Sequence, residues 1–210
     1  MAGRWVTAAA GLALLLGAGP VMAQGKVQKV SKDLVDRAED TRKSVEEAEK
    51  QLKKVVERYG KLLGADSVDD RRDEHGKVRD ELKDLESRAQ DVRERSRSME
   101  EEASKFFAEW TKSLDGIKDT ELRTLSRQSM SDAQTAYGQV VATGRKVADQ
   151  YDAFVTTLTA QLKYLEVDLS DKSLDKLKSS DQDLRGQAKE LQSRVGGLKA
   201  EIKRYVEAMK

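Results

Sequence analysis

Few residues of this chain have side chains that could do acid–base or metal chemistry at a defined site. His75 is the only histidine, and no cysteine is present. A di-iron site in a helical bundle needs two Glu-x-x-His motifs, and the residue three positions before His75 is Arg72. The sequence also has no phosphate-binding glycine loop, no nucleophile elbow and no second histidine for zinc. We therefore expect a packed or capping role for His75, no enzymatic activity, no catalytic residue, no cofactor, no metal and no small-molecule substrate.

A second distinctive group consists of aromatic residues gathered in one stretch, SKFFAEWTKSLDGI at 104–117. Phe106, Phe107 and Trp110 lie within it, although aromatic residues make up only 5% of the chain and charged residues 37%. On a helix, Leu114 extends the same apolar stripe. These side chains either fill a narrow helical core or form an interaction tip, in which Phe107 or Trp110 is exposed and anchors a protein partner or a membrane interface.

The N-terminal residues have the pattern of a secretory signal peptide. One positive residue, Arg4, precedes an apolar run from Trp5 to about Gly19, and the residues that follow end with the small side chain of Ala23. The run is short for a membrane span, and small residues typically precede the cleavage site of a signal peptide. We predict a signal peptide over residues 1–23, cleavage after Ala23 and a periplasmic location. An uncleaved N-terminal anchor is the alternative.

Composition limits the partners of the mature chain. Removing residues 1–23 removes one of the 39 basic residues and none of the 38 acidic ones, so the mature chain carries 38 of each. Phosphate binding normally requires a basic excess, and we therefore expect no nucleic acid partner. The absence of cysteine removes disulfides, thiolate metal sites and a lipidated N-terminal cysteine.

The mature chain has the seven-residue apolar repeat of coiled-coil-like helices. From Val27 to Leu62, apolar or small residues recur almost entirely in alternating steps of four and three. The repeat resumes after each break in the pattern, with charges of both signs between the apolar positions. It predicts four helices, over residues of about 27–63, 68–115, 120–168 and 171–209.

Capping residues mark most of the predicted helix ends. Gly64 is expected to end the first helix, Ser67 to cap the second, and Asp119 or Thr120 to cap the third. No glycine or proline separates the last two helices. A turn near Ser170 and one continuous, kinked helix are therefore both compatible with the sequence, and we place a turn there.

Four long helices with short connections should run antiparallel to their neighbours. The predicted helices 68–115 and 120–168 are each about 72 Å long at the standard rise, whereas the outer two are about 57 Å long. We therefore expect an all-α fold, an elongated antiparallel bundle of three to four long coiled-coil-like helices. It should form a single domain over residues 24–210, with a protruding tip made by the hairpin of the second and third helices.

The predicted hairpin tip, at about residues 105–129, contains most of the aromatic stretch. Two packed helices bury less surface per residue than four, so large side chains are needed to hold such a tip closed. Pairing across the hairpin should place Trp110 opposite Leu125, and Leu114 near Leu122.

The third predicted helix carries few charges. From Asp119 to Leu165 there are five basic and five acidic residues, with alanine, serine, threonine, glutamine and glycine in place of the others. Gly138 and Gly144 lie in this segment, and small residues allow another backbone to approach closely. The helix is either the most enclosed one of the bundle or carries a face for self-association.

Three stretches resemble a known bacterial family: LVDRAEDTRKSVEEAEKQL at 34–52, FFAEWTKSL at 106–114 and QLKYLEVDLS at 161–170. They are similar to the family catalogued as domain of unknown function 2959, in order and over essentially the whole mature chain. The resemblance implies an exported, all-helical, coiled-coil-like protein of Gram-negative bacteria, with no established activity and no catalytic residues to transfer. Relatives often begin with a lipidated cysteine before the first helix. Here Ala23 and Gln24 occupy that place.

The sequence favours a protein that binds other molecules in the cell envelope. The first hypothesis is a periplasmic scaffold or interaction module, which binds another envelope protein or a second copy of itself through the tip or the third helix. The alternative is a protein that binds a membrane surface, because seven basic and three acidic residues follow from Arg185 onward. Four of these basic residues would meet anionic headgroups: Lys199, Lys203, Arg204 and Lys210.

Overall fold

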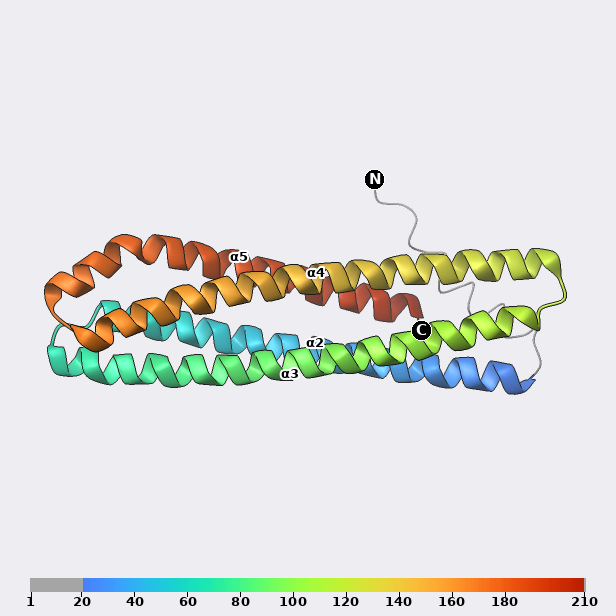
Figure 1. Cartoon of the computed structure of the whole chain (residues 1–210), viewed down its shortest axis with the longest axis horizontal. Helices are drawn as coiled ribbons and strands as arrows, with labels where there is room; N and C mark the ends of the chain where they lie inside the picture. The colour runs from blue at the N-terminus through green and yellow to red at the C-terminus, as the bar shows by residue number, and fades with distance from the viewer. Residues whose placement is uncertain (1–20, 210) are drawn as a thin grey trace. The chain divides into compact units, whose positions relative to one another are not determined.

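A computed structural model of the chain describes residues 21–209, and every regular element in that range is an α-helix (Figure 1). The helices are α2 (Val21–Leu63), α3 (Val68–Asp115), α4 (Thr120–Val167) and α5 (Asp171–Met209). The predicted all-α helical bundle is confirmed. Most of the predicted signal peptide, residues 1–20, lies outside the described residues.

Helices end at the residues whose side chains and backbone suit a cap. The amide of Gly64 donates to two carbonyls of the last turn of α2, each 3.1 Å away. Ser67 caps α3, because its Oγ accepts the amide of Asp70 at 3.1 Å. Asp119 caps α4, and its Oδ1 accepts two amides of the first turn at 2.9 and 3.0 Å. These short connections are the ones that the sequence predicts.

A turn at residues 168–170 separates α4 from α5. Oδ1 of Asp168 accepts the amide of Ser170 at 2.9 Å, and Oδ2 accepts the hydroxyls of Ser170 at 3.0 Å and Ser173 at 2.5 Å. The hydrogen bonds from Ser173 and then Ser170 hold the pKa of Asp168 below its usual range. Side-chain hydrogen bonds therefore form this turn without glycine or proline, and a continuous kinked helix is excluded.

The helices contribute to two compact units. Unit 1 comprises the described parts of Met1–Lys43, Arg93–Ala142 and Lys199–Lys210. Unit 2 comprises Ser44–Val92 and Thr143–Leu198. The loop between α3 and α4 belongs to unit 1, whereas the α2–α3 and α4–α5 turns belong to unit 2.

The core of unit 2 is built from the apolar positions of the seven-residue repeat. All four helices contribute, so each predicted apolar stripe is matched by an apolar stripe of a neighbour. Its buried hydrophobic side chains are Val45, Leu52, Val55, Tyr59, Leu62, Leu63, Val78, Leu82, Leu85, Phe154, Leu158, Leu162, Leu165, Leu174, Leu177, Leu184, Ala188, Leu191, Val195 and Leu198.

The core of unit 1 depends less on α4. From that helix only two hydrophobic side chains, Ala133 and Val140, are buried in unit 1. The other buried hydrophobic side chains come from α2, α3, the α3–α4 loop and α5: Val27, Leu34, Val35, Ala38, Met99, Ala103, Phe106, Trp110, Leu114, Ile117, Ile202, Tyr205, Val206 and Met209.

Within unit 1, α2 runs beside the tip of α3 (Figure 1). Glu109 of α3 accepts a hydrogen bond from Lys112 at 2.7 Å. That bond, and to a lesser degree the charge of Lys26 on α2, holds the pKa of Glu109 below its usual range. The helix begins at Val21 rather than near residue 27, so the hairpin does not extend beyond α2 as far as the sequence suggested.

Among the helices of residues 21–209, α5 alone stops well short of the α3–α4 loop. The rings of Tyr205 and Tyr137 lie 5.8 Å apart, which sets the level of α5 against α4. Met209, the last described residue of α5, therefore lies level with about residue 133 of the antiparallel α4.

Candidate functional site

The four residues of the predicted interaction tip lie mainly in the core of unit 1. Phe106 is 0% exposed, and Trp110 and Leu114 are each 4% exposed. Phe107 is half-buried. Three of the four side chains are thus occupied in packing within the chain, and Phe107 is the one that retains an accessible surface.

The aromatic rings of unit 1 form one connected group, here called the aromatic cluster: Phe106, Phe107, Trp110, Tyr137 and Tyr205. Ring centroids lie 5.3 Å apart for Phe106 and Trp110, and 5.1 Å apart for Phe106 and Phe107. Phe107 meets Tyr137 edge-on at 6.2 Å. Such tilted and edge-on contacts add to the stabilisation from burial alone. The cluster joins α3, α4 and α5, so packing accounts for most of the aromatic stretch.

The contact of Trp110 across the hairpin differs from the predicted one. The indole Nε1 donates to Oγ of Ser126 at 3.0 Å, and Ser126 is 1% exposed. Leu125, the predicted partner, is 54% exposed. The physical reason is that a buried indole N–H requires an acceptor, which serine supplies and leucine does not.

Two tyrosine hydroxyls of the aromatic cluster are buried without a hydrogen-bond partner among the described residues. They belong to Tyr137 and Tyr205. Burial raises the pKa of both phenols, and the charge of Glu100 adds to the rise for Tyr137. Both side chains are therefore neutral at physiological pH, which suits packing and not proton transfer.

His75 has the packing role that the sequence predicts. Its ring is buried in unit 2, and Nε2 lies 2.9 Å from the carbonyl oxygen of Leu162 on α4. A carbonyl only accepts hydrogen bonds, so Nε2 carries the proton and donates it. The histidine links α3 to α4 by this bond.

Arg71, which the sequence analysis did not identify, ties together the two turns of unit 2. It is 6% exposed, and its guanidinium donates to the carbonyls of Ala65 at 3.1 Å and Leu169 at 3.1 Å. It also pairs with the carboxylate of Asp171 and donates to a carbonyl in the α2–α3 turn. Arg71 lies four residues before His75, so both side chains lie on the core-facing side of α3. This spacing is the sequence signal that identifies Arg71.

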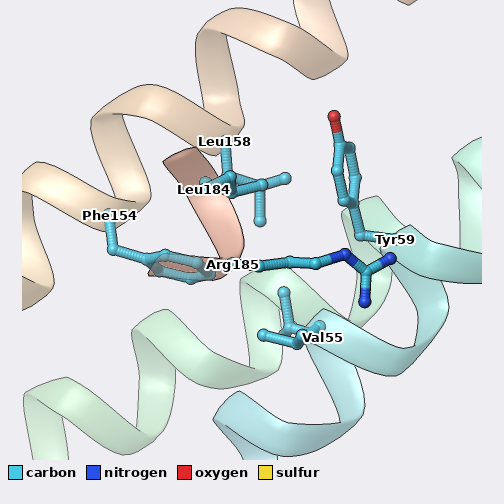
Figure 2. A pocket seen from close by; sticks show the side chains of 7 residues that line it. Val55, Tyr59, Phe154, Leu158, Leu184 and Arg185 are labelled. Carbon is cyan, nitrogen blue, oxygen red and sulfur yellow. The ribbon is translucent and has the colours of Figure 1, made fainter. Parts of the chain in front are cut away.

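The cavity in Figure 2 is too small for a ligand. It has a volume of about 10 Å³ and lies within unit 2. The guanidinium of Arg185 and the ring of Tyr59 border it, above the side chain of Val55 (Figure 2). Sites for small molecules typically have several hundred Å³, so this space holds at most one water molecule.

Residues 21–209 contain neither a metal-binding group of side chains nor a helix that could span a membrane. No group of three or more histidine, aspartate or glutamate side chains in that range could hold a metal ion. Similarly, none of the described helices has a stretch that is both long and apolar enough to cross a membrane.

Helix α4 has a long exposed stripe with few charges, here called the outer face of α4. Its residues, all in unit 1, recur in steps of three and four and are all exposed: Thr124, Arg127, Ser131, Thr135, Gly138 and Ala142. Between Ala133 and Phe154, the only buried side chain of α4 is Val140. The interpretation that the low charge reflects enclosure is therefore wrong, because this part of α4 is largely open to solvent.

The two glycines in the middle of α4 have no packing role within the chain. A Cβ atom added at Gly138 or Gly144 would meet no described atom within 4 Å. Glycine in a helix interior costs about 0.5 to 1 kcal/mol relative to alanine. The same openness is found at Gly76 of α3 and at Gly186, Gly196 and Gly197 of α5.

Comparison with protein families identifies a family that covers nearly all of the described chain. The family described as Protein of unknown function (DUF2959) matches residues 23–209 of the chain. Neither the curated proteins nor the solved structures gave a match. The match extends over all of α3, α4 and α5 and nearly all of α2.

Proposed function

The chain belongs to the DUF2959 family of proteins of unknown function, and we propose that it is a non-enzymatic interaction module of the periplasm that binds another protein. The observation that carries this proposal is the outer face of α4. It is an exposed stripe of α4 within unit 1, and four of its six residues are small and uncharged: Ser131, Thr135, Gly138 and Ala142. Arg127 is the one charged residue of the outer face, whereas solvated helix faces elsewhere in the chain carry charges of both signs.

The polar residues of the core take part in contacts that stabilise the fold, which supports a role without catalysis. His75 donates to a backbone carbonyl, and Arg71 is engaged with the two turns of unit 2. The phenols of Tyr137 and Tyr205 are held neutral by burial. Each of these groups stabilises the fold at its own position, and none of them faces a cavity of ligand size.

Mutation of the outer face tests the proposal in cells. We expect Ser131→Arg to abolish a specific crosslink between the chain and an envelope protein, because a long charged side chain blocks close approach along α4. The matched control is Ser104→Arg, an exposed serine on α3 of the same unit. Crosslinked material from the envelope is identified by mass spectrometry. Equal crosslinking by both variants would contradict the assignment of the interaction to α4.

Binding to a membrane surface receives less support, because basic side chains near the C-terminus pair within α5. Lys203 lies 3.8 Å from Glu207, and Arg194 lies 2.7 Å from Glu190. Pairing of this kind reduces the charge available to anionic headgroups. Co-sedimentation with vesicles of anionic lipid separates the two functions: salt-sensitive binding supports the membrane role, and a chain that remains in the supernatant supports the protein partner.

A further inference from the structure

We infer that α5 carries a releasable strap in unit 2, here defined as residues 181–198. The strap is hinged at the first turns of α5, and it detaches from α2 and α4 of unit 2 while the other helices of that unit stay folded. It goes beyond the proposed function, since the outer face of α4 lies in unit 1 and takes no part in it. Three features of α5 lead to this proposal: unpaired buried polar atoms, a carboxylate in the apolar stripe and an anchored start of the helix.

Polar atoms that are buried without a hydrogen-bond partner concentrate on α5. Among residues 21–209 there are five such side-chain atoms, and four of them belong to this one helix. Asp181 and Gln187 lie in unit 2, and Glu201 and Tyr205 lie in unit 1. Such atoms raise the free energy of the docked helix, and they regain hydrogen bonds to water when the helix leaves. The docked position of α5 is therefore less favourable than its apolar stripe alone would make it.

Asp181 occupies a core position in the seven-residue repeat of α5. Leu177 precedes it by four residues and Leu184 follows it by three, and both leucines are buried. The side chain of Asp181 is only 19% exposed; Oδ2 pairs with Arg185 of the same helix, and Oδ1 is buried without a partner. Burial, and to a lesser degree the charge of Asp181, raises the pKa of Tyr59 on α2, so the carboxylate lies near the core. A carboxylate in this place opposes docking of the strap.

The apolar packing of the strap is also incomplete. Leu184 borders the cavity of about 10 Å³ together with Phe154 and Leu158 of α4 (Figure 2). Farther along the strap, Gly196 and Gly197 are consecutive, and glycine in a helix interior is less stable than alanine. Both features reduce the free energy that keeps the strap docked and helical. Its release uncovers Phe154 and Leu158, so the strap controls access to this apolar surface of unit 2.

Hydrogen bonds and an ion pair anchor the start of α5 and form the hinge. Arg71 pairs with Asp171, and Nε2 of Gln161 donates to Oγ of Ser180 at 3.4 Å. These residues of α5 lie before the strap, within its first ten positions. In the strap itself, Glu190 accepts a hydrogen bond from α4, but at an exposed position where water competes for it. The strap can therefore leave while the α4–α5 turn keeps its structure.

Native-state hydrogen exchange at increasing urea concentrations tests the strap in the full chain. Opening of one part of a protein exposes less surface than global unfolding, so the exchange it permits depends less steeply on denaturant. We expect a shallow dependence for the amides of residues 184–198. The amides of residues 45–62 on α2 and 78–92 on α3 should show the steep dependence of global unfolding. One steep dependence shared by all three segments would overturn the proposal.

Replacement of Asp181 tests the cause of the release. Asp181→Leu completes the apolar stripe, and Arg185 stays solvated because its side chain is 46% exposed. We expect this variant to slow exchange of residues 184–198 at low urea by roughly tenfold or more. Asp183→Leu, at an exposed position of α5, is the matched control and should leave that exchange unchanged. Equal effects of the two substitutions, or unchanged or faster exchange in Asp181→Leu, would overturn the inference.

Discussion

At the scale of single residues, the polar side chains in the core explain how the ends of unit 2 are held. Arg71 is buried where the α2–α3 and α4–α5 turns approach each other, and it donates to backbone carbonyls of both. Backbone carbonyls in turns have no partner within a helix, so a buried guanidinium with several donors satisfies more than one of them. His75 performs a related task one turn further along α3.

We predict that Arg71→Met lowers the free energy of unfolding by about 2 kcal/mol, because it leaves the carbonyls of the turns without their donor. Arg71→Lys should recover only part of this loss, since an ammonium group does not span the same acceptors. The control is Arg72→Met, which removes an exposed pair with Asp69 and should change stability by less than about 0.5 kcal/mol. Urea denaturation measures all three, and equal effects at the two arginines would contradict the role of Arg71.

Stability should fall in alkaline solution because of the buried tyrosines. Burial raises the pKa of Tyr205 above its usual value of 10.0. The contribution of Tyr205 to the free energy of unfolding is therefore fully present below pH 10. It is lost as pH rises above 10, because the unfolded chain releases the phenol proton first. For Tyr205 the loss approaches about 1.4 kcal/mol per pH unit.

Phenylalanine substitution isolates this effect. We expect Tyr205→Phe to unfold with nearly unchanged stability at pH 7, because the hydroxyl has no described partner, and to lose less stability between pH 10 and 11. Tyr164→Phe, at a partly exposed position, should retain the alkaline loss of the parent chain. The same pH slope for both variants would be inconsistent with burial of Tyr205.

Residue-level contacts were less predictable than the helices. The repeat identified the core-facing side of α3 but not the hydrogen-bond acceptor for Trp110, because Ser126 and Leu125 differ by one step around α4. The burial of Arg71 was not predicted, because a charged residue within an apolar stripe is normally interpreted as a break in the stripe. In both cases a polar group had to be satisfied, and apolar periodicity carries no information about that requirement.

At the scale of the elements, α4 is the helix whose composition is not explained by packing. It is poor in charge, yet much of its surface is exposed. The sequence predicted its bounds well, since Asp119 and the Asp168–Ser170 turn provide clear caps. It did not decide between enclosure and exposure, because a helix poor in charge is compatible with both.

Substitution of the two glycines of α4 tests whether these positions are free of close contacts. We predict that Gly138→Ala and Gly144→Ala each raise the free energy of unfolding by about 0.5 to 1 kcal/mol, measured by circular dichroism at a concentration too low for association. The reverse change, Ala142→Gly, should lower it by a similar amount. A loss of stability in either alanine variant would indicate a close contact at that glycine.

At the scale of the whole molecule, the proposed function in the periplasm depends on export of the chain. The family match begins at residue 23, directly beside the predicted cleavage site after Ala23. We expect the protein from the periplasmic fraction of a Gram-negative host to begin at Gln24 when its N-terminus is sequenced. Recovery of the chain with Met1 in the membrane fraction would instead indicate an uncleaved anchor.

A photocrosslinking scan in living cells tests whether the outer face of α4 is a binding surface. Benzoylphenylalanine is placed at each position of α4 from Thr124 to Asp149, and the yield of adducts is measured after irradiation. We expect maxima on the outer face, repeating every three to four residues around Gly138, and minima at the buried Ala133 and Val140. A profile without helical period, or with maxima on the core-facing side, would contradict it.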